Sequence, residues 1–311
     1  MPRSPRLSVG LPVYNGERFL NEALDSVLGQ TYEDFELIIS DNASTDDTEA
    51  ICQRYAKQDS RIRYFRQPKN IGLSPNHNYV VEQGRGELFK WASYDDLYAT
   101  TLLERCIDAL DEHPRHVLAH SWTAMIDSDD VVTKPYVYGL STSSLNAPER
   151  FSSMLYDRGG DDLYGVIRTS VLRQVLPHDS YHNSDRTMVA KLALQGPFYQ
   201  IPEWLYFRRD HPAQAERACP TTRSRCANMD PRRADRLRNP TVRLYGEYLY
   251  AYLDAIRRAP LSDADRRQCY RILVQWITHR GQARRVAEQT IADDVALRVD
   301  TLVAGRERSV P

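Results

Sequence analysis

The first 122 residues alternate between short apolar runs and segments with helical periodicity. Strand-like runs fall at residues 7–13, 35–40, 61–66, 87–92 and 116–122. The residues between these runs place apolar side chains at helical spacing. A regular alternation of strands and helices predicts a mainly parallel, doubly wound α/β sheet. In such a sheet, ligands bind beyond the carboxyl ends of the strands.

Polar clusters follow four of these predicted strands. They are Tyr14-Asn15-Gly16, residues 41–46, residues 70–72 and residues 93–96. Because the carboxyl ends of parallel strands meet at one edge of a sheet, we expect the four clusters to converge there. The sequence therefore predicts a ligand site at this edge.

Asp95 and Asp96 place two adjacent carboxylates after a buried strand. Unpaired carboxylates near a core are costly, and Mg²⁺ or Mn²⁺ would relieve that cost. Taken alone, the pair is more simply explained as a cap for a helix that begins near Thr100. The three other clusters at the same edge favour the metal site instead.

The alternation ends near residue 123, so we expect four parts. They are an α/β half (1–122), a second half (123–214), an Arg-rich linker or mobile loop (215–240) and a helical segment (241–311). A hairpin is predicted at residues 125–132, with a solvated Asp-rich turn. Three helices are predicted near 241–258, 262–279 and 283–304.

The composition excludes several classes of protein. Hydrophobic residues make up 41% of the 311 residues and charged residues 27%, with a formal net charge of -1. This is the balance of a globular protein without a basic field for nucleic acid. No apolar run reaches the roughly 18 residues of a membrane span, and no signal-peptide core is seen, so a cytoplasmic location is expected. The five scattered cysteines predict neither disulfides nor a zinc site.

The four polar clusters resemble, in order and spacing, the motifs of glycosyltransferase family 2. These motifs are P-x-Y-N at residues 12–15, D-D-x-S-x-D at 41–46, N-x-G at 70–72 and a D-x-D strand end at 93–95. The resemblance is strong over residues 6–125 and weaker over 160–212. It implies a GT-A fold with an acceptor-side subdomain and a C-terminal helical extension. The implied activity is inverting transfer of one sugar from a UDP, dTDP or GDP sugar to a hydroxyl group.

The resemblance also assigns donor-binding residues. Pro12, Val13 and Tyr14 would line the base pocket, Glu17 would lie near the base or ribose, and Asp41, Asn42 and Asn70 would complete the nucleotide site. The family pattern has an aspartate where this chain has Asn42. An amide oxygen can still accept a hydrogen bond from uracil or thymine N3–H, so the base identity stays open.

The D-x-D motif departs from the family pattern as well. Ser93 stands at its first acidic position and Asp95 at its second, so Asp95 is the predicted ligand of Mg²⁺ or Mn²⁺. Asp96 would support the metal site or bind sugar hydroxyls, and Tyr94 would lie beside the donor. Ser93 would bind ribose or a metal-bound water.

The catalytic base implied by the resemblance is Asp185, at the start of a predicted helix. A helix N-terminus favours the charged form of a carboxylate. Asp161 and Asp162 are rival bases, and a simple cap is the alternative for Asp185. Arg208 and Arg209 would neutralise the leaving diphosphate, and His211 would bind the metal or a phosphate.

The acceptor stays open as a small molecule, a glycan or a lipid-linked glycan. Without a membrane span or a Q-x-x-R-W motif, single addition is favoured over processive synthesis. The C-terminal helices would pack on the core, form a homodimer interface or line the acceptor site. Two other functions compete: a sugar nucleotidyltransferase, which should show a Gly-rich phosphate loop after the first strand, and a non-catalytic nucleotide-sugar-binding protein.

Overall fold

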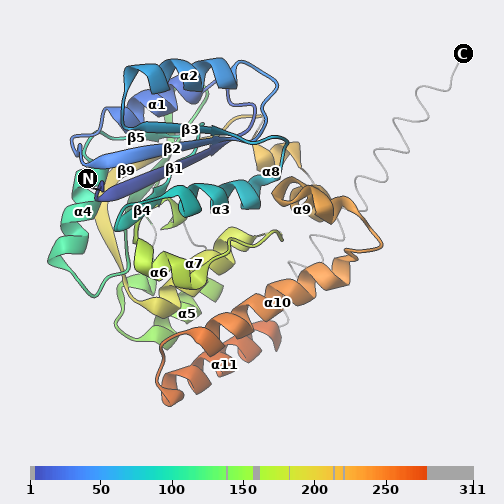
Figure 1. Cartoon of the computed structure of the whole chain (residues 1–311). Helices are drawn as coiled ribbons and strands as arrows, with labels where there is room; N and C mark the ends of the chain where they lie inside the picture. The colour runs from blue at the N-terminus through green and yellow to red at the C-terminus, as the bar shows by residue number, and fades with distance from the viewer. Residues whose placement is uncertain are drawn as a thin grey trace, which may run out of the picture.

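The computed structural model describes residues 4–137, 139–156, 162–181, 183–212, 214–219 and 221–278 of the 311-residue chain. Asp161 and the helix predicted near 283–304 lie outside the described residues. The other elements named in the sequence can be followed in the structure (Figure 1).

A single mixed sheet forms the centre of the described part of the chain. Its strands are β1 (Leu7–Val13), β2 (Phe35–Asp41), β3 (Ile62–Arg66), β4 (Leu88–Trp91), β5 (Leu97–Tyr98), β6 (Leu118–Ile126), β7 (Val132–Tyr136), β8 (Val166–Arg168) and β9 (Phe198–Arg209). The strand order is β3-β2-β1-β4-β8-β6-β9-β5, with β7 paired to β6. The first four strands run parallel, whereas β8 lies antiparallel to both of its neighbours. The predicted mainly parallel α/β sheet is therefore confirmed.

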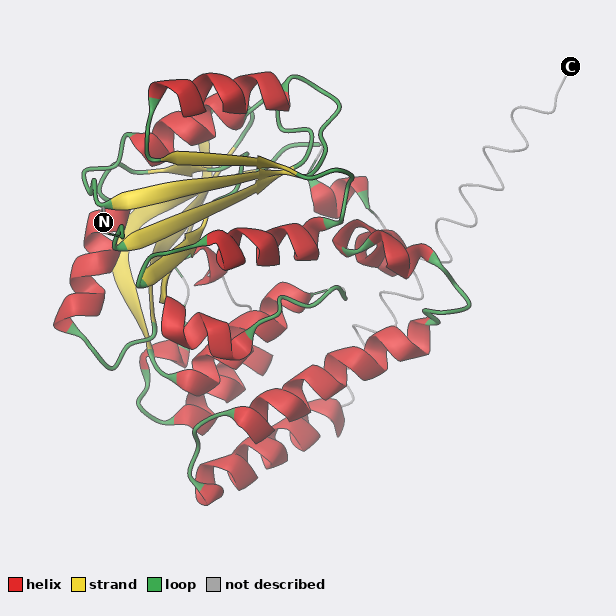
Figure 2. Cartoon of the chain, in the orientation of Figure 1, coloured by secondary structure: helices red, strands yellow, loops and turns green. Residues whose placement is uncertain are grey.

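Helices cover both faces of the parallel half (Figure 2). They are α1 (Leu20–Leu28), α2 (Thr48–Gln58), α3 (Leu73–Gln83) and α4 (Leu102–Glu112). β1 and β2 are buried along their whole length, which explains why their sequences read as continuous apolar runs. The continuous apolar runs in the sequence thus reflect burial of the sheet on both of its faces.

The second half adds a helical layer below the sheet. It comprises α5 (Ala147–Tyr156), α6 (Thr169–Val175) and α7 (Ser184–Gln195), and α10 (Thr241–Arg258) and α11 (Asp263–Thr278) lie outside it. Tyr252, Ile256 and Trp276 of the C-terminal pair are buried in the same hydrophobic cluster as Phe151 of α5 and Met188 of α7. The C-terminal pair is therefore packed on the core rather than separate from it.

Residues 215–240, for which the sequence predicts a linker or mobile loop, contain three short helical elements. These are α8 (Ala215–Ala218), α9 (Thr222–Met229) and η3 (Pro231–Ala234). Thr221 and Ser224 form a capping box at the start of α9. The end of α9 packs on Gly72, where an added Cβ would come within 2.6 Å of the Met229 carbonyl oxygen. An Arg-rich composition concealed this contact because the contact depends on backbone shape and not on apolar side chains.

Gly72→Ala is expected to destabilise the protein by about 1–3 kcal/mol, because Gly72 has a positive φ and no room for a Cβ. The matched control is Gly246→Ala, at a helical position of α10 where nothing lies within 4 Å. Alanine at that position should stabilise the protein by about 0.5–1 kcal/mol. Urea unfolding followed by circular dichroism measures both changes, and equal effects of the two variants would contradict the assigned role of Gly72.

Candidate functional site

The polar clusters converge as expected at the carboxyl edge of the parallel strands (Figure 1). Val13, the last residue of β1, pairs with Asp41, the last residue of β2. The Asn42 N–H donates to the Val13 carbonyl oxygen at 2.8 Å, which continues the pairing beyond both strands. The first two clusters are therefore joined through the backbone.

Asn15 and Glu17 tie the first cluster to the second. Asn15 has a φ of +52° and its Oδ1 accepts the Thr45 N–H at 2.9 Å. The Glu17 carboxylate accepts the Asp47 N–H at 3.0 Å. Pro12 and Val13 are buried beneath this turn, whereas the Tyr14 ring is 40% exposed. Of the three residues predicted to line the base pocket, Tyr14 is thus the one with surface left for a ligand.

Asp41 is fully buried and holds the second cluster in place. Its Oδ2 accepts hydrogen bonds from Arg66 Nη1 at 2.7 Å and from the Tyr64 hydroxyl at 2.9 Å. Its Oδ1 accepts the Ser44 N–H at 2.8 Å. A carboxylate with three such donors is satisfied inside the protein. These three hydrogen bonds fix the conformation of the loop that follows Asp41.

Asn42 connects the second cluster to the third. Its Nδ2 donates to Asn70 Oδ1 at 3.1 Å and to the Gly72 carbonyl oxygen at 3.3 Å. Its Oδ1 accepts the Ile71 N–H at 2.8 Å. The amide is nearly buried, and Asn70 is exposed. A base contact by Asn42 would therefore use the second lone pair of Oδ1.

Asp95 and His211 form the most distinctive pair at this edge. His211 Nε2 lies 3.0 Å from Asp95 Oδ2, and the Ser93 hydroxyl donates to Asp95 Oδ1. The His211 ring packs on Phe19, with centroids 4.8 Å apart. His211 Nδ1 is buried and lacks a hydrogen-bond partner in the described part of the chain. The structure thus brings together the two predicted metal ligands and Ser93.

These residues fit a divalent cation that is shared with a ligand. Within the described ranges, no group of three or more His, Cys, Asp or Glu side chains is placed to hold a metal alone. Mg²⁺ and Mn²⁺ commonly take one or two protein ligands and complete their shell with substrate phosphates and water. A carboxylate and an imidazole at 3.0 Å suit that arrangement.

Arg209 fixes the Asp95–Asp96 loop from beneath. Its backbone N–H donates to Asp96 Oδ1 at 2.9 Å, and its Nε donates to the Asp95 carbonyl oxygen at 2.8 Å. The guanidinium is fully buried and is paired with Asp130 at 2.5 Å and with Glu22 at 3.4 Å. Asp130 belongs to the β6–β7 turn, which the sequence predicts to be solvated. Arg209 is therefore held by the protein, and the neighbouring Arg208 is partly buried.

Lys90 is a site-supporting residue that the sequence analysis missed. It lies in β4, is 1% exposed, and places its ammonium 4.5 Å from the Tyr98 ring centre and 5.8 Å from that of Tyr206. Tyr98 accepts the Ser93 N–H at 2.8 Å, and Tyr206 donates to Asp96 Oδ2 at 2.5 Å. The sequence feature that could have indicated this cluster is a lysine within a short, otherwise apolar strand.

Burial lowers the pKa of the Lys90 ammonium from its usual 10.5 to about 8. The ammonium donates to the Tyr164 carbonyl oxygen, and its two flanking tyrosines are stacked with an interplanar angle of 9°. The cation therefore sits below both tyrosines that hold the fourth polar cluster.

Asp185 is an exposed residue in the first turn of α7. The neighbouring Tyr181 ring packs edge-on against Tyr248 of α10, with centroids 5.9 Å apart. Burial raises the pKa of Tyr248, and the charge of Asp185 adds to that rise. The predicted base thus stands near the contact between Tyr181, which precedes α7, and Tyr248 of α10.

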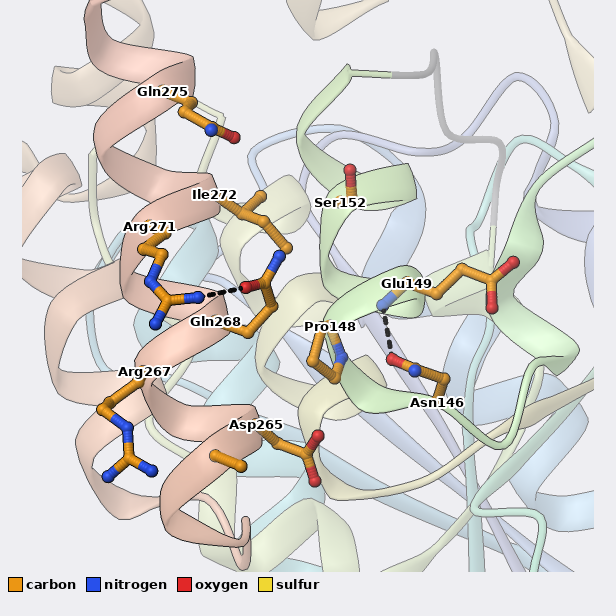
Figure 3. Close-up of a pocket in the computed structure, with 11 residues that line it drawn as sticks. Asn146, Pro148, Glu149, Ser152, Asp265, Arg267, Gln268, Arg271, Ile272 and Gln275 are labelled. Atoms are coloured by element: carbon orange, nitrogen blue, oxygen red, sulfur yellow. Dashed lines mark hydrogen bonds between the residues drawn. The ribbon is translucent and has the colours of Figure 1, made fainter.

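A separate groove of about 780 Å³ lies between α5 and α11 (Figure 3). Asn146 and Glu149 line it from α5 and its lead-in, and Arg267, Gln268 and Arg271 line it from α11. None of the predicted site residues belongs to its lining. Its mixed charges indicate no particular class of ligand.

Comparisons of the sequence with protein families and with known proteins identify glycosyltransferases. Residues 8–175 match the family model described as Glycosyl transferase family 2. A protein of Campylobacter jejuni named GalNAc(5)-diNAcBac-PP-undecaprenol beta-1,3-glucosyltransferase is 27% identical over 197 residues, which cover 63% of this chain and 62% of that protein. An uncharacterized glycosyltransferase of Rickettsia typhi is 39% identical over 109 residues, 35% of this chain and 33% of the relative. The matches thus span less than two thirds of these relatives.

Solved structures share the fold at low identity. S. aureus TarS 1-349 in complex with UDP-GlcNAc has a TM-score of 0.68 at 17% identity, covering 93% of this chain and 79% of that chain. The mannosyltransferase PcManGT from Pyrobaculum calidifontis, in complex with GDP-Man and Mn²⁺, has a TM-score of 0.53 at 16% identity, covering 97% and 88%. These likenesses confirm the predicted fold class.

Lys90→Met is expected to change how stability depends on pH. The depressed pKa means that unfolded chains bind more protons than folded ones between pH 8 and 10.5, so the wild type gains stability as pH rises through this window. Relative to Lys90→Met, the gain from about pH 8 to about pH 9.5 should be about 1.5 kcal/mol. Denaturant titrations of both proteins test this, and a pH-independent difference would contradict the buried cation.

Proposed function

The chain belongs to glycosyl transferase family 2, and we propose that it is an inverting enzyme that moves one sugar from a nucleoside-diphosphate sugar to a hydroxyl acceptor. The observation that carries the proposal is the pairing of Asp95 with His211 at 3.0 Å, at the strand edge where the nucleotide motifs converge. We assign the donor site to residues 1–122 and the acceptor side to residues 123–214. The cytoplasmic location expected from the sequence is part of this proposal.

The donor nucleotide lies, on this proposal, against the first three polar clusters. The exposed face of Tyr14 stacks on or beside the base, and Asn42 accepts a hydrogen bond with its remaining lone pair. Pro12, Val13 and Asp41 shape the pocket from buried positions, and Glu17 and Asn70 flank it. A uridine, thymidine or guanosine donor remains compatible with these groups. The UDP-GlcNAc and GDP-Man complexes of the two fold relatives support this class of donor.

The donor diphosphate lies beside Asp95 and His211. When Mg²⁺ or Mn²⁺ is bound there, it neutralises charge that develops on the leaving diphosphate. Mn²⁺ accompanies GDP-Man in the fold relative PcManGT, which supports this assignment. Ser93 orients the Asp95 carboxylate, Asp96 keeps the loop in place, and Tyr94 lines the same loop. Arg208 supplies a cation to the diphosphate, and the buried Arg209 acts by positioning the Asp95–Asp96 loop.

The acceptor hydroxyl attacks C1 of the donor sugar from the side opposite the diphosphate. A carbon–oxygen bond forms there while the bond from C1 to the diphosphate oxygen breaks, and the electron pair leaves with the diphosphate. Asp185 takes the proton from the attacking hydroxyl, a role that typically contributes about 10²–10⁴-fold. The displacement inverts the anomeric centre because attack and departure occur on opposite faces.

The acceptor class is narrowed by one relative. The Campylobacter jejuni protein is named for transfer of glucose to an undecaprenol-linked glycan. We therefore rank a lipid-linked glycan above a free glycan or a small molecule as the acceptor. No helix within the described ranges has the length and apolar character needed to cross a bilayer.

Donor hydrolysis tests the reaction class. UDP, dTDP and GDP sugars are incubated with the protein and Mn²⁺, and release of the nucleoside diphosphate from one class is expected. Asp95→Asn should lower this release about 10-fold or more, because the metal loses a charged ligand. Release of pyrophosphate would instead indicate a nucleotidyltransferase. Tight donor binding without turnover, even with acceptor glycans present, would leave the binding-protein alternative.

Asp185→Asn is expected to lower turnover by about 10²-fold or more with little change in donor affinity. Asp263→Asn is the matched control, because Asp263 is also an exposed acidic residue in the first turn of a helix, α11. The control should keep full turnover. Rates at saturating donor separate the two variants, and thermal shifts with nucleoside diphosphate report donor binding. Unchanged turnover in Asp185→Asn would overturn the base assignment.

A further inference from the structure

The C-terminal helices carry a charge unlike that of the rest of the chain. Residues 241–278, which contain α10 and α11, hold six arginines and no lysine against four Asp and Glu residues, a formal charge of +2. The whole chain carries -1, so the remaining residues together carry -3. α10 and α11, which form the outer layer below α5 and α7 (Figure 1), thus have an excess of arginine.

The same helices expose large apolar side chains. Val242, Tyr250 and Leu253 of α10 are 77%, 62% and 45% exposed, and Val274 and Ile277 of α11 are 58% and 39% exposed. At 100° per residue, the three α10 side chains lie within an arc of about 80°. Helical spacing thus gathers them into one stripe on the side of α10 that does not pack on the core.

Arginines lie within and beside this stripe. Arg257 and Arg258, 64% and 63% exposed, both pair with Asp254, and the charge of Arg257 also interacts with Tyr250 of α10 and Tyr270 of α11. One carboxylate shared between two guanidinium groups leaves the patch positive. We define the outer face by its residues: Val242, Tyr250 and Leu253 of α10, Val274 and Ile277 of α11, and Arg257 and Arg258.

We propose that this outer face docks the protein on a bilayer surface that contains anionic phospholipids. Helices with an apolar stripe flanked by arginines lie at such surfaces, with the apolar side chains in the headgroup region and the cations on the lipid phosphates. Tyrosine suits this interface because its ring is apolar and its hydroxyl is polar. The arginine stems extend over apolar surface while their charged ends reach the phosphates.

A second copy of the chain fits the outer face less well. A two-fold interface would place this positive face against itself, and like charges across an interface oppose association. A polyanion such as nucleic acid would use the arginines but would leave the stripe of Val242, Tyr250 and Leu253 exposed to water. A surface with both negative charge and an apolar interior satisfies both halves of the face.

The docking also orients the proposed catalytic centre, and this part rests on the proposed function. The Tyr248 ring of α10 packs on Tyr181, and its pKa responds to Asp185. The outer face and the predicted base are therefore on opposite sides of one helix. A lipid-linked acceptor in the same bilayer would meet the enzyme beside α7.

Vesicle flotation of the full chain tests the surface. Vesicles of phosphatidylcholine with about 30% phosphatidylglycerol should carry the protein upward at low salt, and pure phosphatidylcholine or high salt should release it. Tyr250→Ser combined with Leu253→Ser should weaken the partition constant about 10-fold or more. Val131→Ser combined with Val132→Ser is the matched control, because these side chains, at the end of the β6–β7 turn and the start of β7, are 59% and 51% exposed.

The outcomes separate the alternatives. Failure to float with anionic vesicles, or equal binding by both double variants, would overturn the proposal. A concentration-dependent dimer in sedimentation velocity that Tyr250→Ser with Leu253→Ser abolishes would assign the face to a second copy instead. Donor hydrolysis without vesicles is measured on the same preparations. It reports the proposed reaction independently and shows that the variants are folded.

Discussion

The loop of Asp95 and Asp96 depends on the buried guanidinium of Arg209. Burying a charge costs several kcal/mol unless hydrogen bonds and opposite charges in the protein replace its hydration. Here Asp130, Glu22, the Asp95 carbonyl and the Phe19 ring, 4.4 Å from the guanidinium carbon, provide those partners. They come from α1, the fourth polar cluster and the β6–β7 turn. One cation therefore fixes three separate chain segments around the Asp95 carboxylate.

A second buried cation supports the same loop from the sheet side. Lys90 lies below Tyr98 and Tyr206, and these two tyrosines bind the Ser93 N–H and the Asp96 carboxylate. In metal sites generally, the residues behind the ligands matter as much as the ligands, and on the proposed function the two tyrosines have that role. The two cations leave Asp95 as the carboxylate of its pair that faces His211.

The parallel half of the fold could be predicted from the sequence, because strands that are buried on both faces have continuous apolar sequences and lie between amphipathic helices. The convergence of the motifs then followed from topology. The burial of Arg209 could not be predicted, because whether a charged side chain points inward depends on partners distant in sequence, here Asp130 and Glu22. α9 was missed because its docking surface is a glycine backbone. Long-range pairing and backbone shape leave little trace in local composition.

The contact between Gly72 and Met229 has a consequence for synthesis of the chain. The two residues are 157 positions apart, so at the usual 5–20 residues per second the partner of Gly72 emerges roughly 8–30 seconds later. Until then the third polar cluster lacks its outer wall, although the parallel strands beneath it, β1 to β4, are synthesised by residue 91. The turn at Gly72 is consequently covered later than the parallel strands beside it are made. Nascent chains stalled between residues 209 and 229 would contain every strand of the described sheet but not the residue that covers Gly72.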